Sequence, residues 1–346
     1  MEARSRSLRI AVDAMGGDAA PDCIVDGAVA AARDLAIPVL LVGPSDRLRA
    51  HLARASDAAD LDIEIADAPE AVTMGEPAMA ALRKLRPTSI RVAVDAVRAG
   101  RAAALFSAGH TGATVMAAFT GFGMLDGIDR PALAATIPTQ QGAAVLLDVG
   151  ATVECRPLHL LQFAILGSAY AVTALGVERP RIGLLSIGEE AVKGNDLTRE
   201  AYRLLESSGL PFTGNLEARD VYTGRADVIV CDGFTGNVAL KISEGLVEAV
   251  EALLAAELTG SAAARVGARL ARGAFRRFRH RVDYSEYGGA PLLGVAGVCL
   301  VGHGRSSAKA VKNGVALAAR LAADDFLARV VAAVPAPPAG PRPAAH

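Results

Sequence analysis

Tryptophan is absent from the 346 residues, and cysteine occurs only four times. The cysteines lie far apart, with no C-x-x-C pair and no metal-type spacing: Cys23, Cys155, Cys231 and Cys299. In a chain of this length, scattered cysteines are typical of reduced thiols, not of a disulfide framework or a zinc site. The sequence therefore predicts neither a structural disulfide nor a bound metal.

Long apolar runs and an excess of one charge are also lacking. The first residues, MEARSRSLRIAVDAMGG, have no apolar stretch of the kind found in signal peptides. The longest apolar stretch, 158–175, is interrupted by His159, Gln162 and Gly167, and a spanning helix needs roughly 20 clean apolar residues. A formal net charge of -1 gives no global footprint for nucleic acid. These absences predict a soluble, cytoplasmic protein without a nucleic-acid partner.

The common nucleotide and hydrolase signatures are missing as well. The chain contains no G-x-G-x-x-G, no G-x-x-x-x-G-K-[ST], no H-E-x-x-H and no G-x-S-x-G. These motifs mark dinucleotide dehydrogenases, P-loop NTPases, zinc proteases and serine hydrolases. The sequence argues against all four classes and predicts no nucleotide cofactor.

What the sequence does have is glycine, at 35 positions, and apolar residues, at 52%. Short apolar runs alternate with longer helical patterns along most of the chain. Seven runs are predicted as buried strands: 8–13, 38–42, 103–107, 144–148, 181–187, 228–231 and 298–301. This alternation is typical of an α/β fold with a doubly wound, mostly parallel, Rossmann-like sheet.

One region departs from the alternation. From 234 to about 284 the pattern is helical throughout, with a Thr259-Gly260-Ser261 break, which predicts a helical hairpin (245–284) that protrudes from the sheet. We expect 8–333 to form a single catalytic domain that includes this hairpin, with a last helix over 306–331. The remaining residues, 334–346, are rich in Pro and Ala, a composition typical of disorder.

Six strand-to-helix junctions are dense in Gly, Asn, Asp, Ser and Thr. Their sequences are AVDAMGGDAAPD (11–22), FSAGHTGAT (106–114), LDVGAT (147–152), SIGEEAVKGND (186–196), CDGFTGNVALK (231–241) and GHGRSSAKA (302–310). Glycines let the backbone approach a ligand closely, and a following helix points unpaired N–H groups at an anion. Because ligands collect at the carboxyl ends of parallel strands, we expect all six at one sheet edge. Without a nucleotide motif, inorganic phosphate is the simplest anion.

The candidate ligand-binding residues come from these junctions. They are Asp13, Gly16, Gly17, Asp18, His110, Thr111, Gly112, Asp148, Gly194, Asn195, Asp232, Gly233, Thr235, Gly236, His303, Gly304, Arg305 and Ser306. The aspartates and histidines could equally cap loops or helices. Cys231 is at a strand end, but no basic residue near it in the sequence would activate a thiolate.

Lysine is rare, with five positions among the 36 basic residues, and four of them lie in or beside the last three junctions. Lysine is a compact, movable point charge that suits phosphate or a developing oxyanion. Lys193, between Glu190 and Gly194, is interpreted as functional, whereas Lys312 is interpreted as an exposed helix residue.

At the junctions the sequence resembles the acyl-carrier-protein:phosphate acyltransferases of bacterial phospholipid synthesis, the PlsX family. The strings that carry the resemblance run in order from residue 9 to about 332: IAVDAMGGD, SAGHTGA, GIDRPALA, LLDVGA, VKGND, RADVIVCDGFTGNVALK, YGGAPLLG and HGRSSAKA. Two positions depart from the family pattern: His110 and Thr152 stand where the family usually has Asn. Because both side chains still form hydrogen bonds, we expect altered contacts and retained activity.

The resemblance implies a fold similar to the phosphotransacetylases and the isocitrate/isopropylmalate dehydrogenase-like group, in a homodimer without metal or nucleotide. It also implies a reaction in which a long-chain acyl group moves from acyl carrier protein to inorganic phosphate, giving acyl phosphate for phosphatidic acid synthesis. A membrane glycerol-3-phosphate acyltransferase is the implied functional partner.

Phosphate as nucleophile would make a Ser or Cys triad unnecessary, because the protein need only hold it, aim it and stabilise an oxyanion. Lys193 and Asn237 are our candidates for contacting the oxyanion or the leaving thiolate. Helix N-termini at Gly16-Gly17 and Gly233–Gly236, with Arg305 and Ser306, are candidates for holding phosphate.

The hairpin contains seven arginines and no acidic residue between 262 and 282. Four of them, Arg269, Arg272, Arg276 and Arg279, are candidates for contacting an acidic carrier protein, an anionic membrane surface or both. A solvated helix in a dimer is the alternative. If the arginines contact an anionic membrane surface, the cytoplasmic protein would associate with the membrane peripherally.

Three other functions remain open on the sequence. A short-chain phosphate acetyl- or butyryltransferase that uses coenzyme A is the nearest. An oxidoreductase of related fold is disfavoured by the missing cofactor motif, and a membrane-associated scaffold is disfavoured by the intact junctions.

Overall fold

The computed structural model describes residues 8–73, 87–282 and 284–334. Among these residues an eleven-stranded sheet runs through the body of the protein in the order β3-β2-β1-β4-β11-β10-β5-β6-β9-β7-β8. The strands are β1 (Ile10–Asp13), β2 (Val39–Gly43), β3 (Ile63–Asp67), β4 (Ala104–Ser107), β5 (Ala132–Thr139), β6 (Gly142–Leu147), β7 (Ile182–Leu185), β8 (Phe212–Leu216), β9 (Val228–Val230), β10 (Ala290–Leu293) and β11 (Val298–Val301). The predicted α/β fold is confirmed.

All seven predicted strands are present, as β1, β2, β4, β6, β7, β9 and β11. Four strands were not predicted: β3, β5, β8 and β10. Most of these contain glycine, proline or exposed positions, so they lack the clean apolar run that marks a buried strand. Two of them, β5 and β10, hold the centre of the sheet together.

The centre of the sheet is antiparallel. β10 pairs antiparallel with both β11 and β5, and β5 pairs antiparallel with β6. The strands β3, β2, β1, β4 and β11 therefore run in one direction, and β6, β9, β7 and β8 run in the opposite one. The prediction that all six junctions lie at one sheet edge is wrong for this reason. We refer to the two parallel sets as the first and the second half of the sheet.

Helices cover both faces of the sheet. The helices are α1 (Asp22–Leu35), α2 (Ser45–Leu52), α4 (Ser89–Arg98), α5 (Thr111–Phe122), α6 (Pro157–Tyr170), α7 (Asp196–Glu206), α8 (Gly233–Thr259), α9 (Ala262–Leu270), α10 (Arg272–Val282), α11 (Ala308–Ala323) and α12 (Phe326–Ala333). Ile10 and Val12 join a core with α1, α6 and α11, whereas Ala11 joins a second core with α4 and α5. Because successive strand residues alternate between faces, the strands bury both faces, as in a doubly wound sheet.

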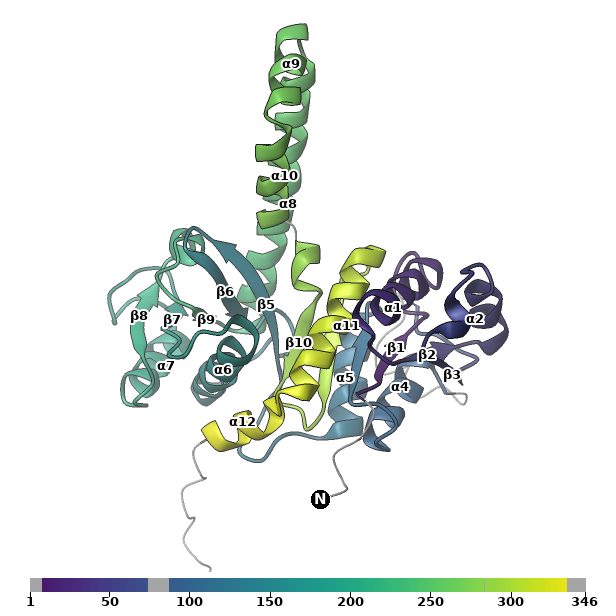
Figure 1. The fold of residues 1–346 in the computed structure, drawn as a ribbon. Coiled ribbons are helices and arrows are strands. Elements are labelled where there is room, and N and C mark those ends of the chain that lie inside the picture. The colour runs from purple at the N-terminus through teal and green to yellow at the C-terminus, as the bar shows by residue number, and fades with distance from the viewer. Residues whose placement is uncertain (1–7, 74–86, 283, 335–346) are drawn as a thin grey trace, which may run out of the picture.

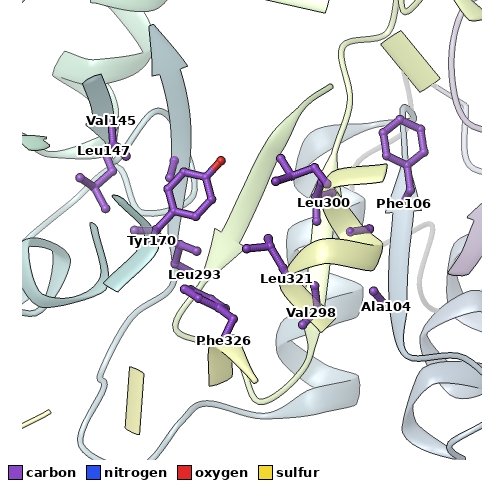
Figure 2. Packing of buried hydrophobic residues seen from close by; sticks show 14 of the residues in the cluster. Ala104, Phe106, Val145, Leu147, Tyr170, Leu293, Val298, Leu300, Leu321 and Phe326 are labelled. Atoms are coloured by element: carbon purple, nitrogen blue, oxygen red, sulfur yellow. The ribbon is translucent and has the colours of Figure 1, made fainter. Parts of the chain in front are cut away.

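The two halves share one continuous core. Figure 2 shows Leu293, Leu321 and Phe326 between side chains of the second half, such as Val145 and Leu147, and Phe106 of the first half. Tyr170 of α6 meets Phe326 of α12 edge to face, with ring centroids 6.4 Å apart. An aromatic pair of this kind contributes about 0.5–1.5 kcal/mol beyond its buried area. The last helix, α12, therefore packs against α6 and stabilises its position.

The predicted hairpin is present and projects far from the body (Figure 1). Its outgoing arm is α8, which begins at Gly233 in the body, and α9 and α10 form the returning arm. The break falls where the sequence predicts it, because the side chain of Ser261 caps α9 by accepting a hydrogen bond from Ala264 N at 3.0 Å.

The predicted last helix, 306–331, is two helices. α11 ends at Ala323 and α12 begins at Phe326, because Asp325 adopts a left-handed conformation (φ 49°) that interrupts the helix. The predicted disordered tail lies outside the described residues apart from Val334.

One helical segment, Pro157–Leu175, is long and apolar enough to cross a membrane by length and composition, contrary to the sequence expectation, but 61% of it is buried inside the protein. Its burial is that of a core helix.

Candidate active site

A cavity of about 460 Å³ lies where the two halves of the sheet meet α8. We call it the central cavity. Predicted site residues that line it are Asp18, Thr111, Asn237, His303, Gly304, Arg305 and Ser306. They come from the junctions after β1, β4, β9 and β11, so residues of both halves meet here despite their opposite strand directions. They meet because the loop after β11 lies against α8, where Arg305 is hydrogen-bonded to Glu248.

Beneath the cavity, the first two junctions are packed backbone to backbone. A Cβ on Gly16 would lie 2.7 Å from Gly109 N, so only glycine fits there. Asp13 is buried below them and accepts a hydrogen bond from Ser107 Oγ at 2.7 Å. Burial raises the pKa of the Asp13 carboxyl, and hydrogen bonds from Ser89 and Ser107 oppose that shift. Asp13 therefore holds the two junctions together and does not line the cavity.

The first and last junctions are joined directly. Asp18 N donates to Gly304 O at 2.8 Å, and Gly17 adopts φ +121°, which favours glycine. Ser307 caps α11 by accepting from Ala310 N, so Ser306 is the residue just before the N-cap. The N-termini of α5 and α11 thus both open toward the central cavity, where their free N–H groups favour an anion.

A cationic group lines the opposite wall. Lys241 Nζ on α8 lies 2.9 Å from Glu244 Oε2 and 3.3 Å from His303 Nε2. Arg305 donates to Glu248 of α8 at 2.8 Å, so the junction after β11 is tied to α8. Burial, and then the charge of Lys241, lowers the pKa of His303, which favours a neutral ring near pH 7. This wall therefore combines one neutral imidazole with two permanent cations, each of which is paired with a glutamate of α8.

The N-terminus of α8 is packed against the loop that follows β6. Asp232 caps the helix by accepting from Thr235 N at 2.9 Å and from Thr235 Oγ1 at 2.7 Å. A Cβ on Gly236 would lie 2.0 Å from Asp148 O, so a glycine is required at this crossing. These predicted site residues, with Gly233, set the position of α8 and thereby of Asn237, one turn further on.

Asp148 organises the loop after β6. Its carboxylate is fully buried and accepts hydrogen bonds from four backbone N–H groups, those of Leu133, Gly150, Ala151 and Thr152. Burial raises the pKa of Asp148 to about 6, and the four donors act in the opposite direction. Its position is that of a loop organiser, because none of its oxygens faces the central cavity.

His110 has a capping position. It is the N-cap of α5, and its Nδ1 accepts a hydrogen bond from Ala113 N at 3.2 Å. Asn is a preferred N-cap residue, so the two residue types can serve the same function at this position. Gly112 lies exposed in the first turn of α5, next to Thr111, which does line the cavity.

The structure does not bring Lys193 to Asn237 in the same chain. Lys193 is exposed on the loop after β7, and neither it nor Gly194 lines the central cavity. Asn195 caps α7 by accepting from Thr198 N at 2.9 Å. Of the two candidates for contacting the oxyanion or the leaving thiolate, Asn237 lines the central cavity and Lys193 does not.

Cys231 has no nucleophilic character here. Burial raises the pKa of its thiol well above the usual range, and nearby Asp148 and Asp232 add to that effect. A thiol held in its neutral form is a poor nucleophile. Within residues 8–73, 87–282 and 284–334, no group of three His, Cys, Asp or Glu side chains could hold a metal ion.

Sequence reasoning missed Lys241 and Glu244 as site residues. Both follow Asn237 on one helical face, at spacings of four and seven residues, which is the signal that could have found them. Lys241 was noted only as one lysine of a junction, and Gly109 only as part of its string.

The chain is similar to known proteins over most of its length. The sequence model of a family described as "Fatty acid synthesis protein" matches residues 8–329. The chain belongs to this family. A phosphate acyltransferase from Geotalea uraniireducens is 52% identical over 311 residues, which cover 90% of each chain. A phosphate acyltransferase from Citrifermentans bemidjiense is 50% identical over 311 residues, covering 90% of this chain and 88% of that protein. The resemblance noted in the sequence is confirmed.

The fold also resembles a solved structure outside the family. A phosphotransacetylase from Streptococcus pyogenes superposes with a TM-score of 0.63 at 18% identity, covering 92% of this chain and 95% of that one. At this identity the likeness concerns the fold alone. It confirms the expected relation of the fold to phosphotransacetylases.

Proposed function

We propose that this protein transfers a long-chain acyl group from acyl carrier protein to inorganic phosphate, forming acyl phosphate for phosphatidic acid synthesis. The observation that carries the proposal is the central cavity, in which two helix N-termini face Lys241 and Arg305. This is the donor set for a small polyanion. The phosphate acyltransferases at about 50% identity support the same reaction.

The reaction needs little from the protein beyond positioning. An oxygen of hydrogen phosphate attacks the thioester carbonyl, a C–O bond forms, and the C–S bond breaks. The proton of hydrogen phosphate passes to the leaving sulfur, so acyl phosphate and a free thiol result. Phosphate has a second pKa near ~6, so much of it is dianionic near neutrality. No enzyme nucleophile is required.

The position of each residue in the central cavity indicates which part of the reaction it would assist. Thr111, at the start of α5, would hold phosphate with its backbone N–H group, and Ser306, just before the N-cap of α11, would do so with its hydroxyl, because its own N–H already donates to His303 O. Arg305 and Lys241 would turn from their glutamate partners to the phosphate. Asn237 stands on the same face of α8 as Lys241 and would donate its amide to the carbonyl oxygen as it becomes an oxyanion. His303, neutral, would donate a hydrogen bond without adding a third charge.

The acyl donor is tested by direct comparison. Long-chain acyl carrier protein and acetyl coenzyme A are each incubated with phosphate and the protein, and acyl phosphate is measured by mass spectrometry. We expect acyl phosphate from the carrier-bound donor. Turnover of acetyl coenzyme A alone would identify a short-chain phosphate acetyl- or butyryltransferase instead, and reduction of a nicotinamide cofactor would indicate an oxidoreductase.

We further propose that the hairpin arginines guide the acidic carrier protein to the site. The side chains of Arg269, Arg272, Arg276 and Arg279 are exposed along α9 and α10. Long-range attraction between exposed charges is screened within about 10 Å at 0.1 M salt. Carrier binding should therefore weaken as salt increases.

Replacing Arg269, Arg272 and Arg276 by glutamate should raise KM for acyl carrier protein about tenfold at low salt and leave KM for phosphate near its starting value. Initial rates across a salt titration measure this. The control reverses three exposed arginines of the body, Arg47, Arg98 and Arg101. If both triple variants behave alike, the hairpin is not the carrier site, and flotation with anionic vesicles then tests peripheral membrane contact.

A homodimer is proposed from the outer ridge of α8. Phe234, Val238, Ile242, Leu246 and Val250 recur every four residues on one exposed face of α8. On the neighbouring loop after β7, Ile187 is 81% exposed and Val192 76%. Contiguous exposed apolar side chains of this extent mark protein interfaces. A second copy would cover this surface, and the loop that carries Lys193 would lie within the contact.

The double substitution Ile242→Glu/Leu246→Glu should convert the dimer to a monomer, because each glutamate would be buried without a partner in the interface. Size-exclusion chromatography with light scattering measures the mass. The control is Leu35→Glu on α1, an exposed leucine away from the ridge. A double variant that keeps the dimeric mass would show that the subunits pair elsewhere.

The chemistry of the proposed product bears on where in the cell the protein would work. Acyl phosphate is a reactive mixed anhydride, so we propose that it passes directly to a membrane glycerol-3-phosphate acyltransferase. A cytoplasmic protein that touches the membrane surface peripherally, through the hairpin, would deliver it there.

A further inference from the structure

Three cavities follow one another along α8. The central cavity shares Thr136, Leu240, Glu244, His303 and Arg305 with a second cavity of about 380 Å³. That second cavity, which we call the groove, shares Glu251 and Arg279 with a third of about 560 Å³ between the arms of the hairpin. The site thus continues beyond the residues needed for phosphate.

The groove is lined by the inner face of α8. Leu240, Glu244, Val247 and Glu251 recur at helical spacing and are partly buried, on the side opposite to the outer ridge. Facing them are Thr136, Ile137 and Pro138 of β5 and the ring of Tyr222. This side of the groove is therefore mostly apolar, and it adjoins the central cavity at Thr136.

The acidic side chains of the groove are paired with cations. Glu244 meets Lys241 at 2.9 Å, Glu248 meets Arg305 at 2.8 Å, and Glu251 meets Arg279 at 3.4 Å. Each pair places a carboxylate beside a cation, so the α8 wall contributes little net charge. Such a wall can line an apolar ligand with the aliphatic stems of its side chains.

We propose that the groove holds the acyl chain of the donor, and that the Glu251–Arg279 pair closes its far end and limits chain length. This inference rests on the proposed acyl transfer. The pair stands between the groove and the hairpin cavity, whose walls include Leu254, Leu258 and Phe278. A chain that outgrows the groove would have to separate this 3.4 Å pair and push both side chains aside.

The first test narrows the groove. Val247→Phe fills space beside Leu240 and should shift the chain-length profile to shorter donors. Each buried methylene contributes about 0.8 kcal/mol, or roughly fourfold in affinity, so excluding two should lower kcat/KM for the longest donor by roughly tenfold or more relative to the shortest. The profile is measured with carrier-bound acyl chains of graded length.

The second test opens the far end. Arg279→Ala should extend the profile toward longer chains by joining the groove to the hairpin cavity. Arg277→Ala, on the same helix but outside all three cavities, is the matched control and should keep the wild-type profile. Exposed ion pairs contribute little to stability, so the variant should fold; its thermal midpoint is checked in parallel.

The outcomes separate the two proposals. Opposite shifts of the profile in the two variants support the groove. Uniform loss at all chain lengths in Val247→Phe, or an unchanged profile in Arg279→Ala, overturns it while acyl transfer stands; a raised KM for every donor would indicate the pantetheine arm as occupant. Failure of the wild type to form acyl phosphate from any donor overturns the proposed function itself.

Discussion

Replacing Lys241 by alanine is expected to lower kcat/KM for acyl transfer by roughly 10²–10³, the loss typical when one preorganised donor to a developing charge is removed. Lys241 is held at the central cavity by Glu244 and lies on the same helical face as Asn237. Its loss would leave the phosphate and the oxyanion without their mobile cation. Steady-state rates over a range of phosphate concentrations measure the effect.

Two further lysine variants make this result specific. Lys312→Ala removes a lysine that pairs with Asp34 of α1, away from the cavity, and should keep its rate. Lys193→Ala tests the interpretation drawn from the sequence, because Lys193 can reach a site only if a second copy supplies it. If Lys241→Ala keeps its thermal midpoint and a near wild-type kcat/KM, Lys241 has no part in the mechanism. A large loss of kcat/KM in Lys193→Ala would instead assign the cationic role to Lys193.

Replacing Asp148 by alanine is expected to lower the free energy of unfolding by roughly 3 kcal/mol, because four backbone N–H groups would lose their acceptor. Each buried donor left unpaired costs about 1–3 kcal/mol, and water entering the space offsets part of the sum. Urea unfolding followed by circular dichroism measures the change.

The matched control is an exposed aspartate. Asp46 of α2 is fully exposed, and substitution at such a surface site usually changes stability by less than about 0.5 kcal/mol. The loss of unfolding free energy in Asp148→Asn should lie between those of Asp46→Ala and Asp148→Ala. Asparagine keeps one acceptor oxygen, but it brings an amide NH₂ close to a backbone N–H. If Asp148→Ala unfolds at the same urea concentration as Asp46→Ala, the carboxylate is not what holds the loop.

The strands that the sequence predicted are those with a local signal. β1, β4 and β11 are short apolar runs that end at Asp, Ser or Gly, and their burial on both faces makes the pattern continuous. β5 and β10 carry proline and small residues and follow loops with glycine, so their composition resembles a loop. Their role depends on pairing with strands far away in the sequence.

The reversal of strand direction could not be predicted from local sequence patterns, for the same reason. The sequence of β6 does not indicate whether it pairs parallel or antiparallel with β5. The hydrogen-bonded ladder between the two strands shows that the pairing is antiparallel. Five of the six junctions nevertheless contribute residues to the central cavity, because the loop after β11 lies against α8, whereas the junction after β7 contributes none. The nature of the anion site was therefore predictable, and its wall of α8 side chains was not.

Lys193 and Lys241 show where this limit lies. Both follow a strand end in a glycine-rich junction, and we preferred Lys193 because Glu190 and Gly194 lie beside it in the sequence. The fold separates them, because Lys241 lies one turn beyond Asn237 on α8, whereas Lys193 lies on an exposed loop of a neighbouring strand. Capping roles of His110 and Asp232 were foreseen as alternatives, and the structure shows both as N-caps. It also shows Asn195 as an N-cap, which was not foreseen.

Incubation of the protein with long-chain acyl carrier protein and radiolabelled phosphate tests the central claim most directly. We expect the label to appear in acyl phosphate, with one free carrier thiol released for each labelled product, and thioester loss to depend on phosphate. Thioester loss without phosphate, or release of the thiol without labelled acyl phosphate, would contradict phosphate as the acyl acceptor.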